Sequence, residues 1–463
     1  MSRLCNILKF FGKSEELQEV DNFDLPTKRI AVIGGGPKAV ALAVKAKVLA
    51  DLGIQRTEVV IFEKQTIGAA WTGDIGYSDG EQRLCTLAER DLGFPYNSLN
   101  FGEKNTDVNL CMLKYSWQRF LVSRELKYSS WVDSGRKPPK HSEFAEYLKW
   151  ALQEANNIPT IGRVDQVKVV QEKWVVEYSD KLGSACVYPE PFDGIVMTGP
   201  GPAKCLSVKD KQGNLTECSR IFNGEDFWRR SDDLKKLIDT IGSEADDLFD
   251  SDILIIGGGG TAAATLAWLL SHGCMKHSIQ VVASRAVLHT RVDSLFENRL
   301  FSDEDTWKTL SKESQDDLFN RLNRGVVWAT VIDKISAAEN LEIKDGKVTS
   351  VEVAKDGGHE HIAVTVVQGN GSKIVITPNI MIDATGFDPL WFKSLLPDWP
   401  ENVIPAQIES LLGPELQYLS PWKLPLLHLP MFSKRVGPGF ASLMVLGSMA
   451  DHILFAYNSA DFA

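Results

Sequence analysis

The sequence has no uninterrupted hydrophobic run long enough to cross a membrane. The stretch that comes nearest, residues 253–270, is broken by four consecutive glycines, which suit a nucleotide-binding turn better than a bilayer span. The N-terminal stretch MSRLCNILKFFGKSEELQEVDNFD has a short apolar run and no small-residue cleavage site, so it does not fit a signal peptide. We therefore expect a cytoplasmic protein with no membrane span.

The sequence also lacks closely spaced cysteine pairs and a net positive charge. The seven cysteines are scattered, with no C-x-x-C pair and no metal-like pairing with histidine, so we predict neither a redox disulfide nor a metal site. The net charge of −11 argues against a general partner of nucleic acid or anionic membranes, because attraction to phosphates needs a basic face. With 463 residues, 44% of them hydrophobic, the chain is long enough for two or three globular domains.

A glycine-rich turn near the start predicts a first nucleotide site. The stretch RIAVIGGGPKAVALAVKAKVLADLG begins as a β-branched strand and continues as an alanine-rich helix. Gly34, Gly36, Pro37 and Ala39 lie at that junction, and a second strand, EVVIF, ends at Glu63. This is the G-x-G-x-x-A dinucleotide fingerprint, in which amides at the helix start hold a pyrophosphate and the acid accepts hydrogen bonds from ribose hydroxyls. A single match also fits an ordinary βαβ turn.

A second copy of the pattern, DILIIGGGGTAAATLAWLL, strengthens the nucleotide interpretation. Its next strand, IQVV, is followed by Ala-Ser-Arg, with no acid where Glu63 stood. A hydroxyl and a guanidinium suit a 2′-phosphate, so this site is predicted to prefer NADPH over NADH. The alternative is that the arginine is only a solvated charge at a strand end. The cofactor-binding candidates of this copy are Gly257, Gly259, Thr261, Ser284, Arg285 and Arg291.

Two later segments predict a return to the first domain. KIVITPNIMIDATGFDP is expected to be a strand that delivers Thr385 and Gly386 to a turn, and FASLMVLGSMADHIL a strand, then Gly447, then a helix. In two-dinucleotide flavoproteins such pieces close over the flavin. We therefore predict an α/β fold with two Rossmann-like domains, one for FAD and one for NADPH, in a flavin oxidoreductase. The predicted parts are an N-terminal extension (1–27), the first part of the FAD domain (28–202), a connection (203–250), the NADPH domain with substrate-contacting segments (251–372) and the return segment (373–463).

Two subclasses of flavin enzyme fit poorly. Disulfide reductases need a redox cysteine pair beside the flavin, and the sequence has no C-x-x-C. Baeyer–Villiger enzymes and flavin-containing monooxygenases carry F-x-G-x-x-x-H between the two nucleotide motifs. Here FNGEDFW supplies Phe222 and Gly224, but Trp228 occupies the histidine position.

A third subclass fits along the whole chain from about residue 28. The sequence resembles the N-hydroxylating monooxygenases of siderophore biosynthesis, and most closely the L-lysine N6-monooxygenases of mycobactin-type pathways. The motifs that carry the resemblance are AVIGGGPKAVA, KYSWQRFLV, SEFAEYLKW, MTGPG, LFENRLFSD, NRGVVWATV, DATGFDPLWF and GPGFASLMVLG.

The resemblance also implies roles for single residues. Trp71 matches an aromatic residue that packs along the flavin. Asn298 matches a catalytic asparagine between nicotinamide and substrate, and Asn323 one that hydrogen-bonds the amino acid. Arg90 stands where relatives have a substrate-binding lysine, and a family serine is replaced around Phe455. An arginine can bind a carboxylate bidentately, but its reach and geometry differ from those of lysine.

The implied reaction uses NADPH to reduce FAD, which adds O2 as a C4a-hydroperoxide that the lysine side-chain amine attacks. Its product would be N6-hydroxylysine for siderophore or related biosynthesis. Ornithine, cadaverine and putrescine remain alternative substrates, because one methylene changes pocket depth only slightly. A non-catalytic regulatory protein that binds FAD and NADPH is the alternative from a different class. Relatives are often dimers or tetramers, so a homo-oligomer is possible.

Overall fold

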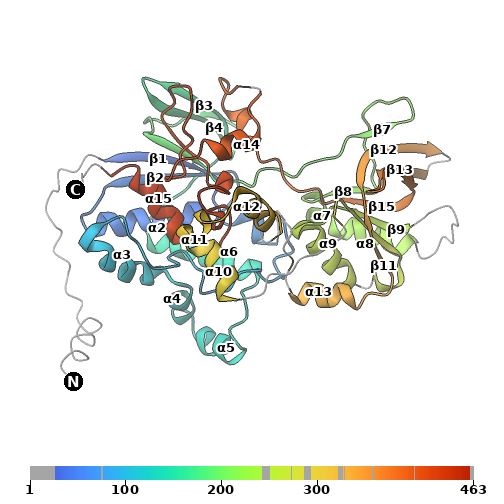
Figure 1. Ribbon diagram of the computed structural model, residues 1–463, viewed down its shortest axis with the longest axis horizontal. Helices are drawn as coiled ribbons and strands as arrows, with labels where there is room; N and C mark the ends of the chain where they lie inside the picture. The colour runs from blue at the N-terminus through green and yellow to red at the C-terminus, as the bar shows by residue number, and fades with distance from the viewer. Residues whose placement is uncertain are drawn as a thin grey trace.

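The computed structural model describes residues 27–73, 77–241, 251–272, 274–285, 294–321, 327, 329–356, 359–400 and 402–458. These residues form two bodies that lie side by side (Figure 1). Within them the strands make three sheets, and none of the described helices is long and apolar enough to cross a bilayer.

The larger body is built on a seven-stranded sheet of order β16-β6-β1-β2-β3-β4-β5. The strands from β16 to β3 run parallel, and β4 and β5 extend the sheet antiparallel. In β1 the four residues 30–33 are all buried, as expected for a strand covered on both faces. The strands are β1 (Lys28–Ile33), β2 (Thr57–Glu63), β3 (Thr160–Val170), β4 (Lys173–Asp180), β5 (Ala185–Val187), β6 (Gly194–Met197) and β16 (Leu426–His428).

Helix α2 is the central helix of this body and packs against β2, α3, α6 and α15. Its sequence is rich in alanine and valine, and most of its residues are buried, which lets it lie close to its neighbours. The chain segments before and after the smaller body contribute these α-helices to the larger body: α2 (Pro37–Asp51), α3 (Asn105–Met112), α4 (Trp117–Val122), α5 (Lys127–Asp133), α6 (His141–Glu154), α14 (Pro405–Ser410) and α15 (Leu446–Phe455).

The smaller body has a parallel five-stranded sheet of order β11-β10-β9-β15-β8. Alternate residues of β9 face opposite sides: Ile253 and Ile255 pack against the helices, whereas Leu254 and Ile256 pack against a second, four-stranded sheet. The elements of the first sheet and its helices are β8 (Ile221–Asn223), β9 (Ser251–Ile256), β10 (Ile279–Ala283), β11 (Leu341–Asp345), β15 (Pro378–Asp383), α7 (Asp226–Arg229), α8 (Ser231–Ile241), α9 (Gly260–Ser271) and α13 (Ala329–Ser336). The covering sheet is β14-β13-β12-β7, formed by β7 (Val208–Asp210), β12 (Lys347–Asp356), β13 (His359–Val367) and β14 (Lys373–Ile376).

Three short helices cross back from the smaller body to the larger one. They are α10 (Leu295–Ser302), α11 (Glu304–Lys308) and α12 (Lys312–Phe319). Phe301, Trp307 and Phe319 join the core of the larger body, and the indole N–H of Trp307 donates to the Lys434 carbonyl at 2.8 Å. Part of the stretch predicted as the NADPH domain therefore packs on the first body.

The structure corrects three further expectations about where segments lie. The predicted connection 203–250 contributes β7, β8, α7 and α8 to the smaller body, apart from residues 242–250, which lie outside the described residues. The predicted return segment begins too early, because β14 and β15 pair within the smaller body. The strand predicted in FASLMVLG is wrong: a short 3₁₀ helix (Pro438–Ala441) is followed by turns and α15. A short buried apolar run cannot be told from a strand by its pattern alone.

Candidate functional site

The first glycine turn joins β1 to α2. Gly34 has φ of +101°, and its N–H donates to the Phe62 carbonyl at 2.8 Å. A Cβ on Gly34 would lie 2.5 Å from the Thr198 hydroxyl, so both the backbone conformation and the close approach require glycine. Gly36 caps α2 in an extended conformation, and a Cβ there would meet no atom within 4 Å. Space is therefore open in front of the helix.

The second glycine turn, between β9 and α9, repeats this construction. Gly257 has φ of +132°, and its N–H donates to the Val282 carbonyl at 2.8 Å. A Cβ on Gly257 would collide with the Ala384 carbonyl. Gly259 caps α9 in the same extended conformation as Gly36 caps α2. The two turns are thus built from equivalent contacts.

Neither of these two helices has a side chain that caps its N-terminus. The structure gives no side-chain hydrogen bond to the cap, and no acid in the first turn, of α2 or α9. Ser116, Ser294 and Ser311, by contrast, cap α4, α10 and α12 with their hydroxyls. Because the first amides of a helix attract anions, the bare starts of α2 and α9 are suited to phosphate groups.

The strand beside each turn ends differently. In the first unit Glu63 is buried, and its carboxylate accepts hydrogen bonds from the N–H of Gly35 at 2.7 Å and of Gln65 at 2.9 Å. The equivalent residue of the second unit is Ala283, because Phe62 and Val282 hold equivalent register positions beside the two turns. The two units therefore differ in charge at the position where the fingerprint places the ribose.

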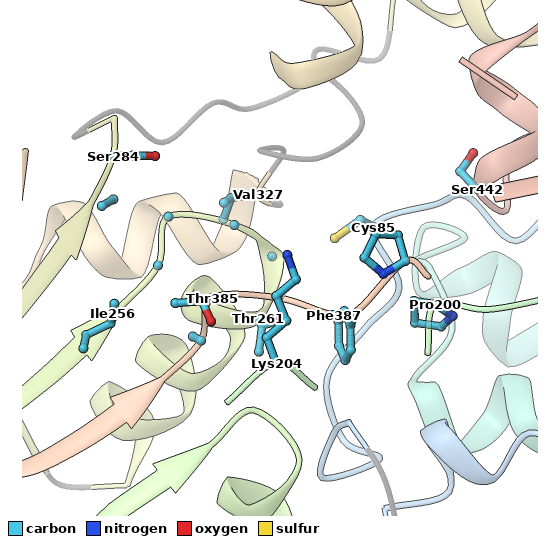
Figure 2. Close-up of a pocket in the computed structure, with 18 of the residues that line it drawn as sticks. Cys85, Pro200, Lys204, Ile256, Thr261, Ser284, Val327, Thr385, Phe387 and Ser442 are labelled. Carbon is cyan, nitrogen blue, oxygen red and sulfur yellow. The ribbon is translucent and has the colours of Figure 1, made fainter. Parts of the chain in front are cut away.

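A cavity of about 970 Å³ lies where the two bodies meet. Figure 2 shows it between Ser284 at the end of a strand of the smaller body and Ser442 and Cys85 of the larger body, with Thr261, Thr385 and Phe387 between them. The predicted cofactor residues that line it are Gly257, Gly259, Thr261, Ser284, Thr385 and Gly386. The structure therefore brings the second glycine turn and the D-A-T-G turn together at one site.

The charges that line this cavity are all positive. Arg90, Lys204 and Lys347 line it, whereas no Asp or Glu is found among its described lining residues. Such a lining is notable in a chain with net charge −11, and it favours an anionic ligand. Sequence reasoning missed both lysines, because Lys204 reaches the site from the segment after β6 and Lys347 from the start of β12.

Arg90 is held in place by the turn that carries it. Its guanidinium lies 4.7 Å above the Phe94 ring and donates to the Met444 carbonyl at 3.3 Å. The next residue, Asp91, accepts from the Tyr96 hydroxyl at 2.7 Å and the Trp117 N–H at 2.8 Å. Burial raises the pKa of Asp91 to about 6. The turn thus fixes Arg90 on the cavity wall.

Three other predicted residues are not among the described residues that line this cavity. Asn298 is half-buried on α10, one turn before Phe301, which does line the cavity. Trp71 stacks on His141, with ring centroids 5.9 Å apart, and its backbone N–H donates to Gly68, whose own N–H donates to the Gly35 carbonyl of the first glycine turn at 3.0 Å. Arg285 is exposed and is not among the described lining residues.

The remaining candidates have structural contacts or cannot be placed. The N–H of Gly447 donates to the Phe94 carbonyl at 2.9 Å, and a Cβ there would collide with the backbone of Gly93. Phe455, at the end of α15, is 37% exposed and does not line the cavity. Arg291 and Asn323 lie outside the described residues.

Two Rossmann-like units that meet at one cavity define a two-dinucleotide α/β protein, and this predicted fold class is confirmed by solved structures. The lysine monooxygenase NbtG from Nocardia farcinica, described for the conformation of its NADPH domain, is 29% identical and superimposes with a TM-score of 0.74 over 92% of this chain and 99% of its own. The ornithine N-hydroxylase KtzI from Kutzneria sp. 744, solved with reduced FAD, NADP⁺ and L-ornithine, shares the fold at 16% identity, with a TM-score of 0.67 over 93% of this chain and 99% of its own.

The sequence comparisons identify the family. Residues 112–389 match the model of the L-lysine 6-monooxygenase/L-ornithine 5-monooxygenase family. The L-lysine N6-monooxygenase MbtG of Mycobacterium sp. (strain MCS) is 32% identical over 94% of this chain and 97% of that protein. MbtG of Mycobacterium tuberculosis is 32% identical over 92% and 94%. The chain belongs to this family of flavin monooxygenases, which confirms the resemblance drawn from its motifs.

Proposed function

We propose that this chain is an FAD- and NADPH-dependent monooxygenase that hydroxylates the side-chain amine of L-lysine. The observation that carries the proposal is that α2 and α9 both begin at a glycine turn with no side-chain cap. The turn before α9 faces a cavity that both bodies line and that contains only positive charges among its described lining residues. Family membership supplies the reaction class. The relatives described as L-lysine N6-monooxygenases favour lysine.

The first unit fits FAD. The open space at Gly36 and the uncapped amides of α2 suit the pyrophosphate, and Glu63 lies at the strand end where a ribose acceptor is needed. Pro37, Trp71 and the segment around Gly447 complete the residues that we assign to this cofactor. The flavin, when bound and reduced, supplies the activation of O2 that no side chain can provide.

The second unit fits NADPH. The turn from Gly257 to Thr261 lines the cavity together with Ser284, and the absence of a carboxylate at Ala283 leaves room for a 2′-phosphate. Lys204 lines the same cavity as Thr261 (Figure 2), and its backbone N–H donates to the Gly386 carbonyl at 2.8 Å. We assign Lys204 to charge neutralisation of the pyrophosphate.

The cavity also suits the amino acid. Arg90 is a fixed cation on its wall, and we assign it to the substrate α-carboxylate. The side-chain amine must be neutral to act as a nucleophile, although a free lysine amine has a pKa of about 10.4. Removal of the amine from water in this cavity would favour its neutral form and so lower its pKa. Asn298 and Asn323 are proposed to hold the amino acid and, for Asn298, the nicotinamide.

A product assay with four amines tests this function. Lysine, ornithine, cadaverine and putrescine are offered, and hydroxylamine product is quantified separately from NADPH consumption. Arg90→Ala should raise KM for lysine about 10- to 100-fold, the worth of one charge-assisted hydrogen bond, while NADPH-driven flavin reduction stays within twofold of wild type. Arg83→Ala, at an exposed arginine of the same segment, is the matched control and should change neither value.

Each alternative has its own result in this assay. Higher turnover of a diamine than of lysine would mean that Arg90 does not read a carboxylate. Higher turnover of ornithine than of lysine would support the proposed reaction but would contradict lysine as the substrate. Absence of hydroxylamine with every amine, in protein that holds FAD and oxidises NADPH, would contradict the enzyme assignment and favour a regulatory flavoprotein.

A further inference from the structure

The connection from β11 to β12 closes over the end of β10. Gly346 is the one residue between the two strands, and its N–H donates to the Ala283 carbonyl at 2.8 Å. Ala283 occupies in the second unit the place that Glu63 has in the first. The residue after Gly346, Lys347, therefore begins its strand beside the position where the fingerprint places the adenosine ribose.

Lys347 is the cation at this end of the cavity. Its side chain is exposed and lines the cavity together with Ser284. Within the part of the chain that the structure describes, no hydrogen bond or ion pair of the Lys347 ammonium group is found. Two lysines on the same pair of strands differ: Lys344 lies 3.1 Å from Glu342, and Lys355 lies 3.3 Å from Glu360.

The acid that is closest in sequence does not occupy this end of the cavity. Asp345 precedes Gly346, but one carboxylate oxygen would lie 2.5 Å from a Cβ on Gly369. Its carboxylate is thus turned toward the connection between β13 and β14, and Asp345 is not among the described lining residues. Arg285, the cation that the sequence favoured, does not line the cavity either.

We propose that Lys347 and the Ser284 hydroxyl form the subsite for the 2′-phosphate, and that Lys347, rather than Arg285, determines the preference for NADPH over NADH. The proposal rests on the assignment of the second unit to NADPH. A flexible ammonium group and a hydroxyl, with no carboxylate among the described lining residues of the cavity, are the donors that a phosphate dianion requires. Lys347 lies 85 residues after Ala262, the last residue of the G-x-G-x-x-A fingerprint, so the fingerprint does not include it.

Binding measurements on the FAD-loaded protein test the proposal without catalysis. Dissociation constants are measured by calorimetry for NADP⁺, NAD⁺ and adenosine 2′,5′-bisphosphate, which has the 2′-phosphate but no nicotinamide. Lys347→Met should weaken binding of NADP⁺ and of the bisphosphate about 10- to 100-fold and leave the Kd of NAD⁺ within twofold. Arg285→Met should change each value less than threefold. Lys355→Met, on the same strand, is the matched control and should change none.

A conservative variant and the flavin content test whether weaker NADP⁺ binding in Lys347→Met comes from a disturbed fold instead of the lost charge. Lys347→Arg keeps a cation and should retain NADP⁺ binding within about threefold of wild type. All variants should hold FAD in the wild-type ratio. Equal loss of NADP⁺ and NAD⁺ in Lys347→Met, a larger loss in Arg285→Met, or a wild-type protein that binds both nucleotides equally would each overturn the proposal. A protein that prefers NADP⁺ yet makes no hydroxylamine would instead contradict the proposed function and leave the role of Lys347 standing.

Discussion

The two glycine turns of this chain have nearly the same backbone and different surroundings. Each begins with a glycine at positive φ whose N–H donates to the neighbouring strand, and each ends in an extended glycine that caps a helix without side-chain help. The strand on the other side of each turn leaves no space for a Cβ at the first glycine. The equivalent pairs are Gly34 and Gly257, Gly36 and Gly259, Phe62 and Val282, and Thr198 and Ala384.

The difference lies at the end of the second strand of each unit. Glu63 accepts two backbone hydrogen bonds and so helps to hold its own turn, whereas Ala283 contributes no polar side chain and is approached by Gly346. We propose that the shared backbone accommodates a dinucleotide in each unit and that the side chains around the strand end select which dinucleotide binds. On this proposal the selecting side chain of the first unit lies on its own second strand, whereas that of the second unit lies on β12, a strand of the covering sheet.

The largest expected effect is loss of a cofactor from one unit and not the other, produced by one substitution in each glycine turn. Gly36→Leu and Gly260→Leu both add side chains where a Cβ would meet no atom within 4 Å, so the fold should tolerate them. Gly36→Leu should remove FAD almost completely, because the side chain fills the space in front of α2. Gly260→Leu should retain FAD and weaken NADP⁺ binding at least tenfold, because Gly260 lines the cavity. Flavin absorbance and NADP⁺ titration measure the two effects, with circular dichroism as a control for folding. Loss of both ligands in either variant would contradict independent sites.

The two turns could be predicted from sequence because their contacts are local. The G-x-G-x-x-A spacing fixes the strand, the turn and the helix start within a dozen residues, and Gly34, Gly36, Gly257 and Gly259 all lie as that spacing predicts. The fold class followed from the repetition of the unit.

The composition of the cavity could not be predicted in the same way. Lys204 and Lys347 reach it through crossings between sheets, which no local pattern encodes. The apolar run around Phe440 reads as a strand but forms a 3₁₀ helix and turns, because burial in an irregular segment gives the same pattern. The crossing of α10–α12 back to the larger body likewise depends on distant partners such as Lys434.

A second prediction transfers the defining side chain from one unit to the other. Ala283→Glu places a carboxylate in the second unit where Glu63 stands in the first. The new charge should repel a 2′-phosphate and accept from ribose hydroxyls, so the ratio of NADP⁺ to NAD⁺ affinity should fall about 10- to 100-fold. The expected loss in thermal stability is small, because a Cβ on Gly258 would lie 2.9 Å from the Ala283 Cβ much as one on Gly35 would lie 3.0 Å from that of Glu63, and we therefore expect the Gly258 N–H to bond the new carboxylate. Calorimetric titration with both nucleotides measures the ratio, with Ala283→Gln as the uncharged control. An unchanged ratio would mean that this position does not face the ribose.

The smallest effect concerns His428 in the larger body. The Nδ1–H of His428 donates to the Glu415 carbonyl at 2.8 Å, so Nε2 accepts from the Tyr457 hydroxyl at 2.7 Å, and the ring is neutral and fully buried. Burial lowers the pKa of His428 to about 4, and that of His141 also to about 4.

Because the unfolded chain takes up a proton near pH 6.5 and the folded His428 does not, stability is present above that pH and is lost as the pH falls toward 4. As the pH falls from 7 toward 4, the unprotonated His428 lowers the free energy of unfolding by about 2–3 kcal/mol, which corresponds to a fall of roughly 5 °C in Tm. His428→Gln should lower Tm at pH 7, because the contacts of the imidazole are lost. It should also make the decline of Tm between pH 6.5 and 4.5 less steep, and His141 should account for part of the decline that remains. His272→Gln, at an exposed position on the smaller body, should leave the decline unchanged. Thermal scans at several pH values measure this, and an identical decline in His428→Gln and wild type would show that the buried ring does not resist protonation.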